Sequence, residues 1–178
     1  MTSDTARALV VDASLAIAIA VQEPGYDLAV SILRDRGAAG EKLIVPAFFW
    51  LELVNVLIKR HRLAPGVVLE ALVDLENLGL ESVELERPQL LLTIDAMGRG
   101  GLSAYDAAYL ALAESADAEL LTCDRHLAAA AGNRALPLGG GHAVEEARES
   151  YGPSWAAWPG AAVYLQKLRA QVAAQANG

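Results

Sequence analysis

Short, continuous apolar runs that end beside an acidic residue alternate with longer helical patterns along this chain. Two of them have the same design: Leu9–Val11 is followed by Asp12, and the run ending at Thr122 is followed by Cys123 and Asp124. Apolar runs without alternation are typical of strands buried on both faces of a parallel sheet. Strands of this kind separated by helices indicate βαβ units, so the chain is predicted to fold as an α/β sandwich with a parallel sheet.

The pattern also predicts the individual elements. Strands are expected at 8–12, 43–46, 82–85, 118–124 and 134–138, and helices at 15–22, from after Gly25 to Arg36, and at 47–62, 64–79, 88–100 and 102–113. Ser14 is expected to cap the first helix and Pro46 to stand in the first turn of helix 47–62. Because helix 47–62 is apolar nearly all round, it is expected to be largely buried.

Length and composition favour one main domain with an appendage. The chain has 178 residues, of which 54% are hydrophobic, which suffices for one compact core. The domain is predicted at 1–138. Residues 139–178 begin with a glycine run and include tryptophans and prolines before a predicted amphipathic helix. The apolar face of this C-terminal helical tail is formed by Tyr164, Leu165, Leu168 and Val172.

Charge and cysteine content restrict the environment and the partners. The net charge of −8 and pI near 4.8 argue against passive nucleic-acid binding through a broad basic surface, and leave metal ions and basic proteins as partners. The single cysteine allows no intramolecular disulfide, which favours a reducing compartment. No apolar window is long enough for a membrane span, so a cytoplasmic protein with no membrane association is expected.

Asp106 stands within the apolar side of a predicted helix, in the stretch LSAYDAAYLALA. At about 100° per residue it falls inside the arc of apolar residues instead of opposite it. That arc contains Leu102, Tyr105, Tyr109, Leu112 and Ala113. Ser103 and Asp106 have the spacing of a capping box, which is one explanation. The other is that Asp106 points toward a partner.

Three further carboxylates stand at places where ligands bind or where charge is unexpected. Asp12 and Asp124 follow strands, and ligands of open α/β sheets bind outside the carboxyl ends of strands. Glu52 is the carboxylate of a nearly apolar helix. Each also has a structural explanation: Asp12 as a turn residue, Asp124 as a helix cap, Glu52 in a solvent-facing stripe with Asn55 and Lys59.

If the four acids meet, they need compensation, because neighbouring buried carboxylates raise one another's pKa. A divalent cation supplies it. Oxygen ligands without a His or Cys constellation suit Mg²⁺ or Mn²⁺, which bind substrate phosphates. The chemistry that follows is phosphodiester hydrolysis.

Four segments together resemble the acidic motifs of the PIN-domain nucleases, especially the VapC-type toxins of toxin–antitoxin pairs. They are VVDAS, PAFFWLELVNVL with Glu six residues after Pro, LSAYDAAYLALA and LLTCDRHL, in the expected order over residues 8 to 138. The resemblance implies a three-layer α/β/α sandwich. It also implies an acidic catalytic pocket that holds Mg²⁺ or Mn²⁺ for RNA hydrolysis, formed by Asp12, Glu52, Asp106 and Asp124.

The resemblance implies partners as well. Members of this family commonly dimerise and are held inactive by a small antitoxin, so an RNA substrate, a cognate antitoxin and a homodimer are expected. The hydroxyls of Thr122 and Ser14 are candidates for orienting the acids, with helix capping the alternative for Ser14. The alternatives for function are an RNA-processing or DNA-directed PIN-like nuclease and a degenerate binding module. Retention of all four acids argues against the last.

Two features are not explained by the resemblance. The roughly forty residues after Leu138 are unexpected in a VapC-like chain. The basic run KRHR, Lys59 to Arg62, is interpreted as a cationic helix end favoured by the helix dipole, with binding of RNA phosphates as the alternative.

Overall fold

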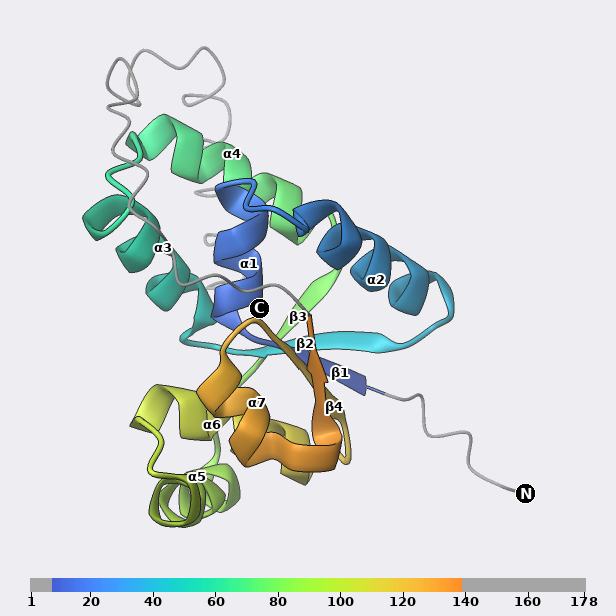
Figure 1. Ribbon diagram of the computed structural model, residues 1–178, viewed down its shortest axis with the longest axis vertical. Helices are drawn as coiled ribbons and strands as arrows, with labels where there is room; N and C mark the ends of the chain where they lie inside the picture. Colours follow the sequence, from blue (N-terminus) through green and yellow to red (C-terminus); the bar gives the residue numbers. More distant parts are fainter. Residues whose placement is uncertain (1–7, 139–178) are drawn as a thin grey trace, which may run out of the picture.

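The computed structural model describes residues 8–138, which contain a five-stranded, fully parallel sheet (Figure 1). The strands are β1 (Ala8–Val11), β2 (Lys42–Pro46), β3 (Leu80–Val83), β4 (Glu119–Thr122) and β5 (Ala135–Pro137), in the order β3-β2-β1-β4-β5. The predicted parallel sheet is confirmed. The predicted C-terminal helix, like residues 1–7, lies outside the described residues.

Within residues 8–138, seven helices cover the two faces of the sheet (Figure 1). The layer on one face consists of α1 (Ala13–Ala20), α2 (Tyr26–Ala38), α3 (Phe49–Lys59) and α4 (Pro65–Glu76). The layer on the other face consists of α5 (Arg87–Gly100), α6 (Ala104–Ser115) and α7 (Arg125–Ala131). The three-layer α/β/α sandwich is therefore confirmed. Each described helix is too short or too polar to cross a bilayer.

The strand order reverses at β1, which pairs with β2 on one side and β4 on the other. Val11 lies opposite Leu121, and the backbone N–H of Asp12 donates to the Leu121 carbonyl at 3.1 Å. The chain leaves β1 for one helical layer and β4 for the other (Figure 1). A crevice at the carboxyl ends of two such strands is the usual ligand site of an open α/β sheet.

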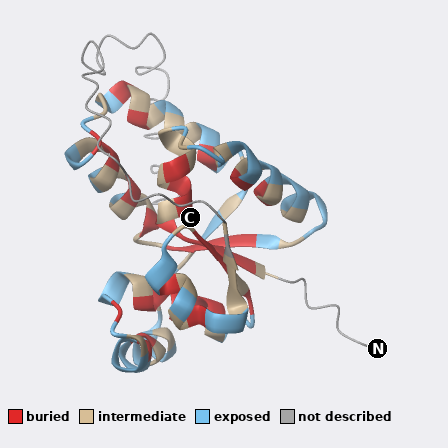
Figure 2. Ribbon diagram, in the orientation of Figure 1, coloured by how far each residue is buried: buried red, intermediate tan, exposed pale blue. Residues whose placement is uncertain are grey.

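The core lies between the central strands and the helices on both sides (Figure 2). Leu9, Val10 and Leu120 are fully buried, as their unbroken apolar runs predict. Helix α6 is buried along its whole middle, from Ala107 to Ala113. Its alanines allow it to fit between the sheet and α5, with which it also packs.

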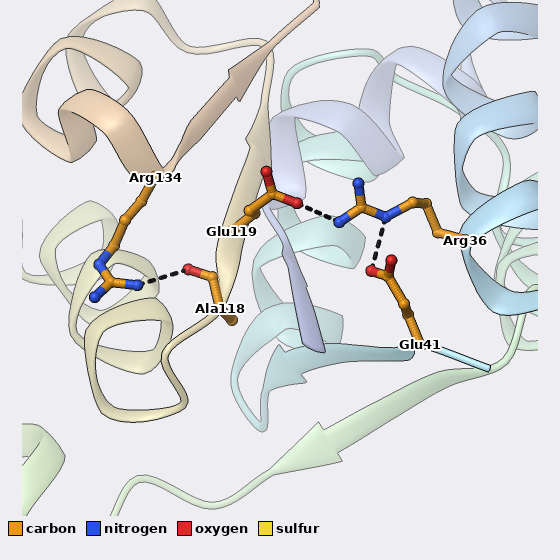
Figure 3. A network of polar contacts seen from close by, with 5 residues as sticks. All are labelled: Arg36, Glu41, Ala118, Glu119 and Arg134. Atoms are coloured by element: carbon orange, nitrogen blue, oxygen red, sulfur yellow. Dashed lines mark hydrogen bonds and ion pairs between the residues drawn. The ribbon is translucent and has the colours of Figure 1, made fainter. Parts of the chain in front are cut away.

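Polar contacts stabilise the opposite, amino-terminal end of the sheet (Figure 3). Arg36 of α2 donates from Nε to Glu41 at 2.7 Å and forms a second ion pair with Glu119, the first residue of β4. Arg134 donates to the carbonyl of Ala118 at 3.2 Å. These contacts connect α2 with the segments that precede β2, β4 and β5, at the end of the sheet opposite the carboxyl ends of the strands.

The structure corrects the expectations for helix 47–62. Pro46 is the last residue of β2, paired with Val83, and α3 begins three residues later at Phe49. The helix is not largely buried: Phe49, Leu53 and Leu57 form one buried face, whereas Leu51 is 75% exposed. The helix has more apolar residues than its inner face can bury, because its outer side faces solvent.

The predicted strand 82–85 is displaced by two residues and runs from Leu80 to Val83. Gly79, with φ of +81°, takes the left-handed conformation that ends the α4 connection and lets the strand begin at once. Tyr105 was expected on the inner side of α6 but is 60% exposed. It lies in the first turn, beyond the edge of the core.

Candidate metal site

Asp12 is the most buried of the four acids. It follows β1 directly, is 4% exposed, and accepts hydrogen bonds on Oδ2 from Thr122 Oγ1 at 2.8 Å and from Ser14 Oγ. Burial raises the pKa of Asp12, the two hydroxyl hydrogen bonds oppose that rise, and the negative charge of Asp106 adds to it. The protein therefore keeps a carboxyl group where its charged form is disfavoured.

Ser14 and Thr122 connect the ends of the two central strands around Asp12. Ser14 Oγ accepts from the backbone N–H of Cys123 at 3.0 Å, and Thr122 Oγ1 accepts from the backbone N–H of Asp124 at 2.9 Å. The prediction that these hydroxyls orient an acid is consistent with these contacts. The expected capping role of Ser14 is wrong, because α1 begins at Ala13 and its N-cap position is Asp12.

Glu52 points into the sandwich from the first turn of α3. It is half-buried, and Tyr109 of α6 donates from its hydroxyl to Glu52 Oε2 at 2.7 Å. Burial raises the pKa of Glu52, the Tyr109 hydrogen bond lowers it, and Asp12 and Asp106 raise it further. This contact directs Glu52 toward the other acids, whereas Asn55 and Lys59, farther along the same side of α3, are exposed.

Asp106 both takes part in the helix cap and lies near the other acids. Ser103 is the N-cap of α6: its Oγ accepts from the Asp106 N–H at 3.2 Å and donates to Asp106 Oδ2 at 2.7 Å. The capping interpretation is thus confirmed. Asp106 also lies close enough to Asp12 and Glu52 for its charge to raise the pKa of both. The cap contact with Ser103 holds the Asp106 carboxylate in one position.

Asp124 caps α7, as one of its two interpretations predicted. Its Oδ1 accepts from the backbone N–H groups of His126 at 2.7 Å and Leu127 at 2.9 Å. Its own N–H is bonded to Thr122, which also holds Asp12. The capping leaves Oδ2 of Asp124 free of hydrogen bonds to other described residues. Thr122 therefore forms hydrogen bonds with both Asp12 and Asp124.

The structure brings Asp12, Glu52 and Asp106 into electrostatic contact, with Asp124 attached at the side. Within the described residues, no group of three or more His, Cys, Asp or Glu side chains is arranged closely enough to hold a metal ion by itself. None of the four acids forms an ion pair with any cation of the described part. A cavity of about 810 Å³ lies elsewhere, between α2 and α4, and none of the four lines it.

The donor set fits a hard divalent cation. Mg²⁺ binds through one or two carboxylates and keeps waters and substrate phosphates as its other ligands, so it does not require a closed cage of side chains. Asp12 is buried and lacks a positive partner among the described residues, with two further acids in electrostatic range. A cation at this point would remove the cost of holding these charges together.

Sequence reasoning did not find the role of Tyr109 or Phe48. Tyr109 was placed in the apolar arc of α6, three residues after Asp106, but its hydrogen bond to Glu52 spans 57 positions of the chain. Phe48 packs edge-on against Tyr109 and Tyr105, with ring centroids 5.5 and 5.4 Å apart. The sequence shows that Tyr109 is aromatic and lies on the inner side of its helix. It does not show that Glu52 is its hydrogen-bond partner.

Comparison with known proteins agrees with this geometry. The family model for the PIN domain matches residues 9–133, so the chain belongs to the PIN-domain family, a family of nucleases. The resemblance drawn from the four acidic motifs is thereby confirmed at the level of the family. A search of curated proteins found no match.

The solved structures that are similar to this chain include the following two. The crystal structure of PAE2754 from Pyrobaculum aerophilum has 28% sequence identity and a TM-score of 0.53, and the match covers 74% of this chain and 83% of that one. The structure of Mycobacterium tuberculosis VapC20, a toxin that cleaves the sarcin-ricin loop, has 16% identity and a TM-score of 0.49, covering 68% of this chain and 94% of that one.

Proposed function

We propose that this protein is an endoribonuclease that hydrolyses RNA phosphodiester bonds with Mg²⁺ or Mn²⁺. The observation that carries the proposal is the state of Asp12: a buried carboxylate, at the point where the strand order reverses, with other acids in range and no cation beside it among the described residues. Membership of a nuclease family supports the hydrolytic chemistry.

In this proposal the metal is held by Asp12, Glu52, Asp106 and Asp124. A divalent metal bound there supplies a hydrolytic water of lowered pKa and offsets negative charge on the phosphate. Thr122 and Ser14 hold the carboxylate of Asp12 in one orientation, and Tyr109 does the same for Glu52. Such supporting contacts fix the direction of metal ligands and are typical of metal sites.

We further propose that the protein is the toxin of a type II toxin–antitoxin pair, acts in the cytoplasm, forms a homodimer and is inhibited by a cognate antitoxin. The support is the four-motif resemblance to VapC-type toxins together with the net charge of −8, which suits a basic inhibitory segment. These context assignments extend beyond the chemistry of the site and are tested separately, by co-expression with a candidate antitoxin.

The direct test of the chemistry is cleavage of a mixed RNA pool by purified protein with Mg²⁺ or Mn²⁺, against EDTA and against Asp106→Asn. The variant keeps the size of the side chain and removes its charge. Asp74→Asn, at an exposed position of α4, controls for the loss of one acid. We expect cleavage that needs the metal and Asp106, and a DNA pool in parallel to remain intact. Equal cleavage by Asp106→Asn would contradict the proposal.

A further inference from the structure

A basic cluster formed by Lys59, Arg60 and Arg62 follows the end of α3 and takes no part in the site described above. All three side chains are exposed, and none forms an ion pair or hydrogen bond with another described residue. Elsewhere, Arg36, Arg99 and Arg134 each pair with an acid. Arg34 and Arg87 are also exposed without an ion pair to a described residue, but they stand apart, whereas Lys59, Arg60 and Arg62 are neighbours.

The backbone at Arg62 makes the cluster harder to explain as a helix end. Arg62 has φ of +58°, in a turn closed by hydrogen bonds from His61 N to Val56 O and from Leu63 N to Leu57 O, both 3.1 Å. This conformation after a helix normally belongs to glycine or asparagine, because other side chains are strained in it. The helix dipole explains Lys59 in the last turn, but it does not explain a strained arginine beyond the turn.

The basic cluster lies at the far end of α3, the helix that carries Glu52. Glu52 and Lys59 are seven residues apart on α3, so they lie on the same side of the helix about 10 Å apart along its axis. The intervening residue on this side, Asn55, is exposed and polar. Helices α1 and α3 pack together and both begin at the site, so their far ends lie in one direction from it (Figure 1).

The acids around the basic cluster do not neutralise it. Glu23, just after α1, lies within electrostatic range of Arg60, but the two form no ion pair. Burial raises the pKa of Glu23, and the positive charge of Arg60 opposes that rise. His61, between the cations, is 5% exposed and its Nε2 atom has no hydrogen-bond partner among the described residues. His61 therefore faces inward while the three cations face solvent.

We propose that the basic cluster binds the phosphate backbone of the RNA substrate on one side of the cleaved bond, at the far end of the polar side of α3. This inference rests on the proposed endoribonuclease function. An acidic protein that hydrolyses a polyanion needs a local positive surface, since its overall field repels the substrate. Exposed, unpaired cations beyond the end of the helix that carries Glu52 supply that surface.

The test uses the full chain with Lys59→Gln, Arg60→Gln and Arg62→Gly combined. Glycine relieves the backbone strain at position 62, so the fold is retained while the charge is lost. Binding of a fluorescein-labelled single-stranded RNA of mixed sequence is measured by anisotropy in EDTA over a range of salt concentrations. We expect affinity to fall about tenfold at low salt, and the slope of log K against log salt to decrease by about two, for three lost phosphate contacts.

Cleavage kinetics with Mn²⁺ provide the second readout. Because the basic cluster lies away from the acids, its loss should raise KM about tenfold and leave kcat unchanged, as removal of uniform binding does. Arg34→Gln combined with Arg87→Gln is the control, since both arginines are exposed and form no ion pair with a described residue. This control variant should keep the KM and salt slope of the unaltered protein.

The outcomes separate this inference from the proposed function. If the unaltered protein cleaves RNA and the triple variant retains its KM and salt slope, the basic cluster does not contact the substrate and the inference is wrong. If the control variant loses affinity equally, the effect is one of net charge and the inference is also wrong. If the unaltered protein neither binds nor cleaves RNA, the proposed function fails first and the inference falls with it.

Discussion

At the scale of one residue, Asp12 lowers the stability of the folded, metal-free protein. Its carboxyl group is buried and takes its hydrogen bonds from two hydroxyls, with no positive partner in the described part of the chain. Its pKa is raised above the ordinary value of 3.8, so the folded protein holds the proton more tightly than the unfolded chain does. The stability of the metal-free protein therefore decreases as pH rises from 3.8 through the folded-state pKa.

From this we predict that Asp12→Asn stabilises the metal-free protein at neutral pH, by about 1 kcal/mol or more, because a buried unpaired charge is removed. The gain should vanish at pH values below 3.8, where the carboxyl group is protonated in both states. Urea unfolding in EDTA at several pH values measures it. Asp74→Asn, at an exposed position, is the control and should change stability little. Destabilisation by Asp12→Asn at neutral pH would contradict the account.

Tyr109 provides a second prediction at this scale. It is fully buried, and its hydroxyl donates to Glu52. Tyr109→Phe keeps the ring against Phe48 and removes one hydrogen bond, so stability should fall by about 1 kcal/mol. Glu52 loses its orienting partner, and metal affinity should fall about 10-fold or more. A titration with Mn²⁺ measures the affinity; unchanged affinity would show that Tyr109 only packs.

At the scale of elements, a glycine permits the close approach of α5 to α7 and to the loop before α6. A Cβ atom at Gly100, the last residue of α5, would lie 3.1 Å from Leu102 Cγ and 3.2 Å from Ala130 Cβ. Gly98, one half-turn earlier, has no atom within 4 Å of such a Cβ. The two glycines differ in packing although both belong to the same helix, which makes them a matched pair.

We therefore predict opposite effects of alanine at these positions. Gly98→Ala should raise the free energy of unfolding by about 0.5–1 kcal/mol, because alanine favours the helix and nothing opposes its methyl group. Gly100→Ala should lower it by about 1 kcal/mol, since Leu102 and Ala130 must move. Thermal unfolding of the two variants in parallel tests this. Equal gains in stability for both variants would contradict the close approach of α5 to α7 and to the loop before α6.

At the scale of the whole molecule, the sheet was predictable from residues that act locally. Leu9–Val11 and Leu120–Leu121 are buried on both faces, so their unbroken apolar runs indicate parallel strands without knowledge of the partner. Ser103 and Asp124 cap the helices their spacing indicates. Pro46 and Leu51 were misjudged because composition does not show which side of a helix faces solvent, or whether a proline ends a strand or begins a helix.

The candidate site residues that follow strands could be predicted from the sequence. Asp12 and Asp124 stand out because the carboxyl ends of parallel strands lie at one edge, and the strand order places β1 beside β4. The Tyr109–Glu52 contact was not predictable, because it joins α3 and α6, which lie in opposite helical layers (Figure 1). Long-range contacts between helices depend on packing, which local sequence patterns do not encode.

We propose that Asp12, Glu52, Asp106 and Asp124 hold a divalent cation, and calorimetric titration of the purified full chain with Mn²⁺ tests this most directly. We expect saturable binding that is lost in Asp12→Asn and Asp106→Asn and kept in Asp74→Asn. We also expect a rise in melting temperature with Mn²⁺ in the unaltered protein, because a ligand that binds the folded state stabilises it. Absence of saturable binding, or binding equally strong in Asp12→Asn, would contradict this proposal.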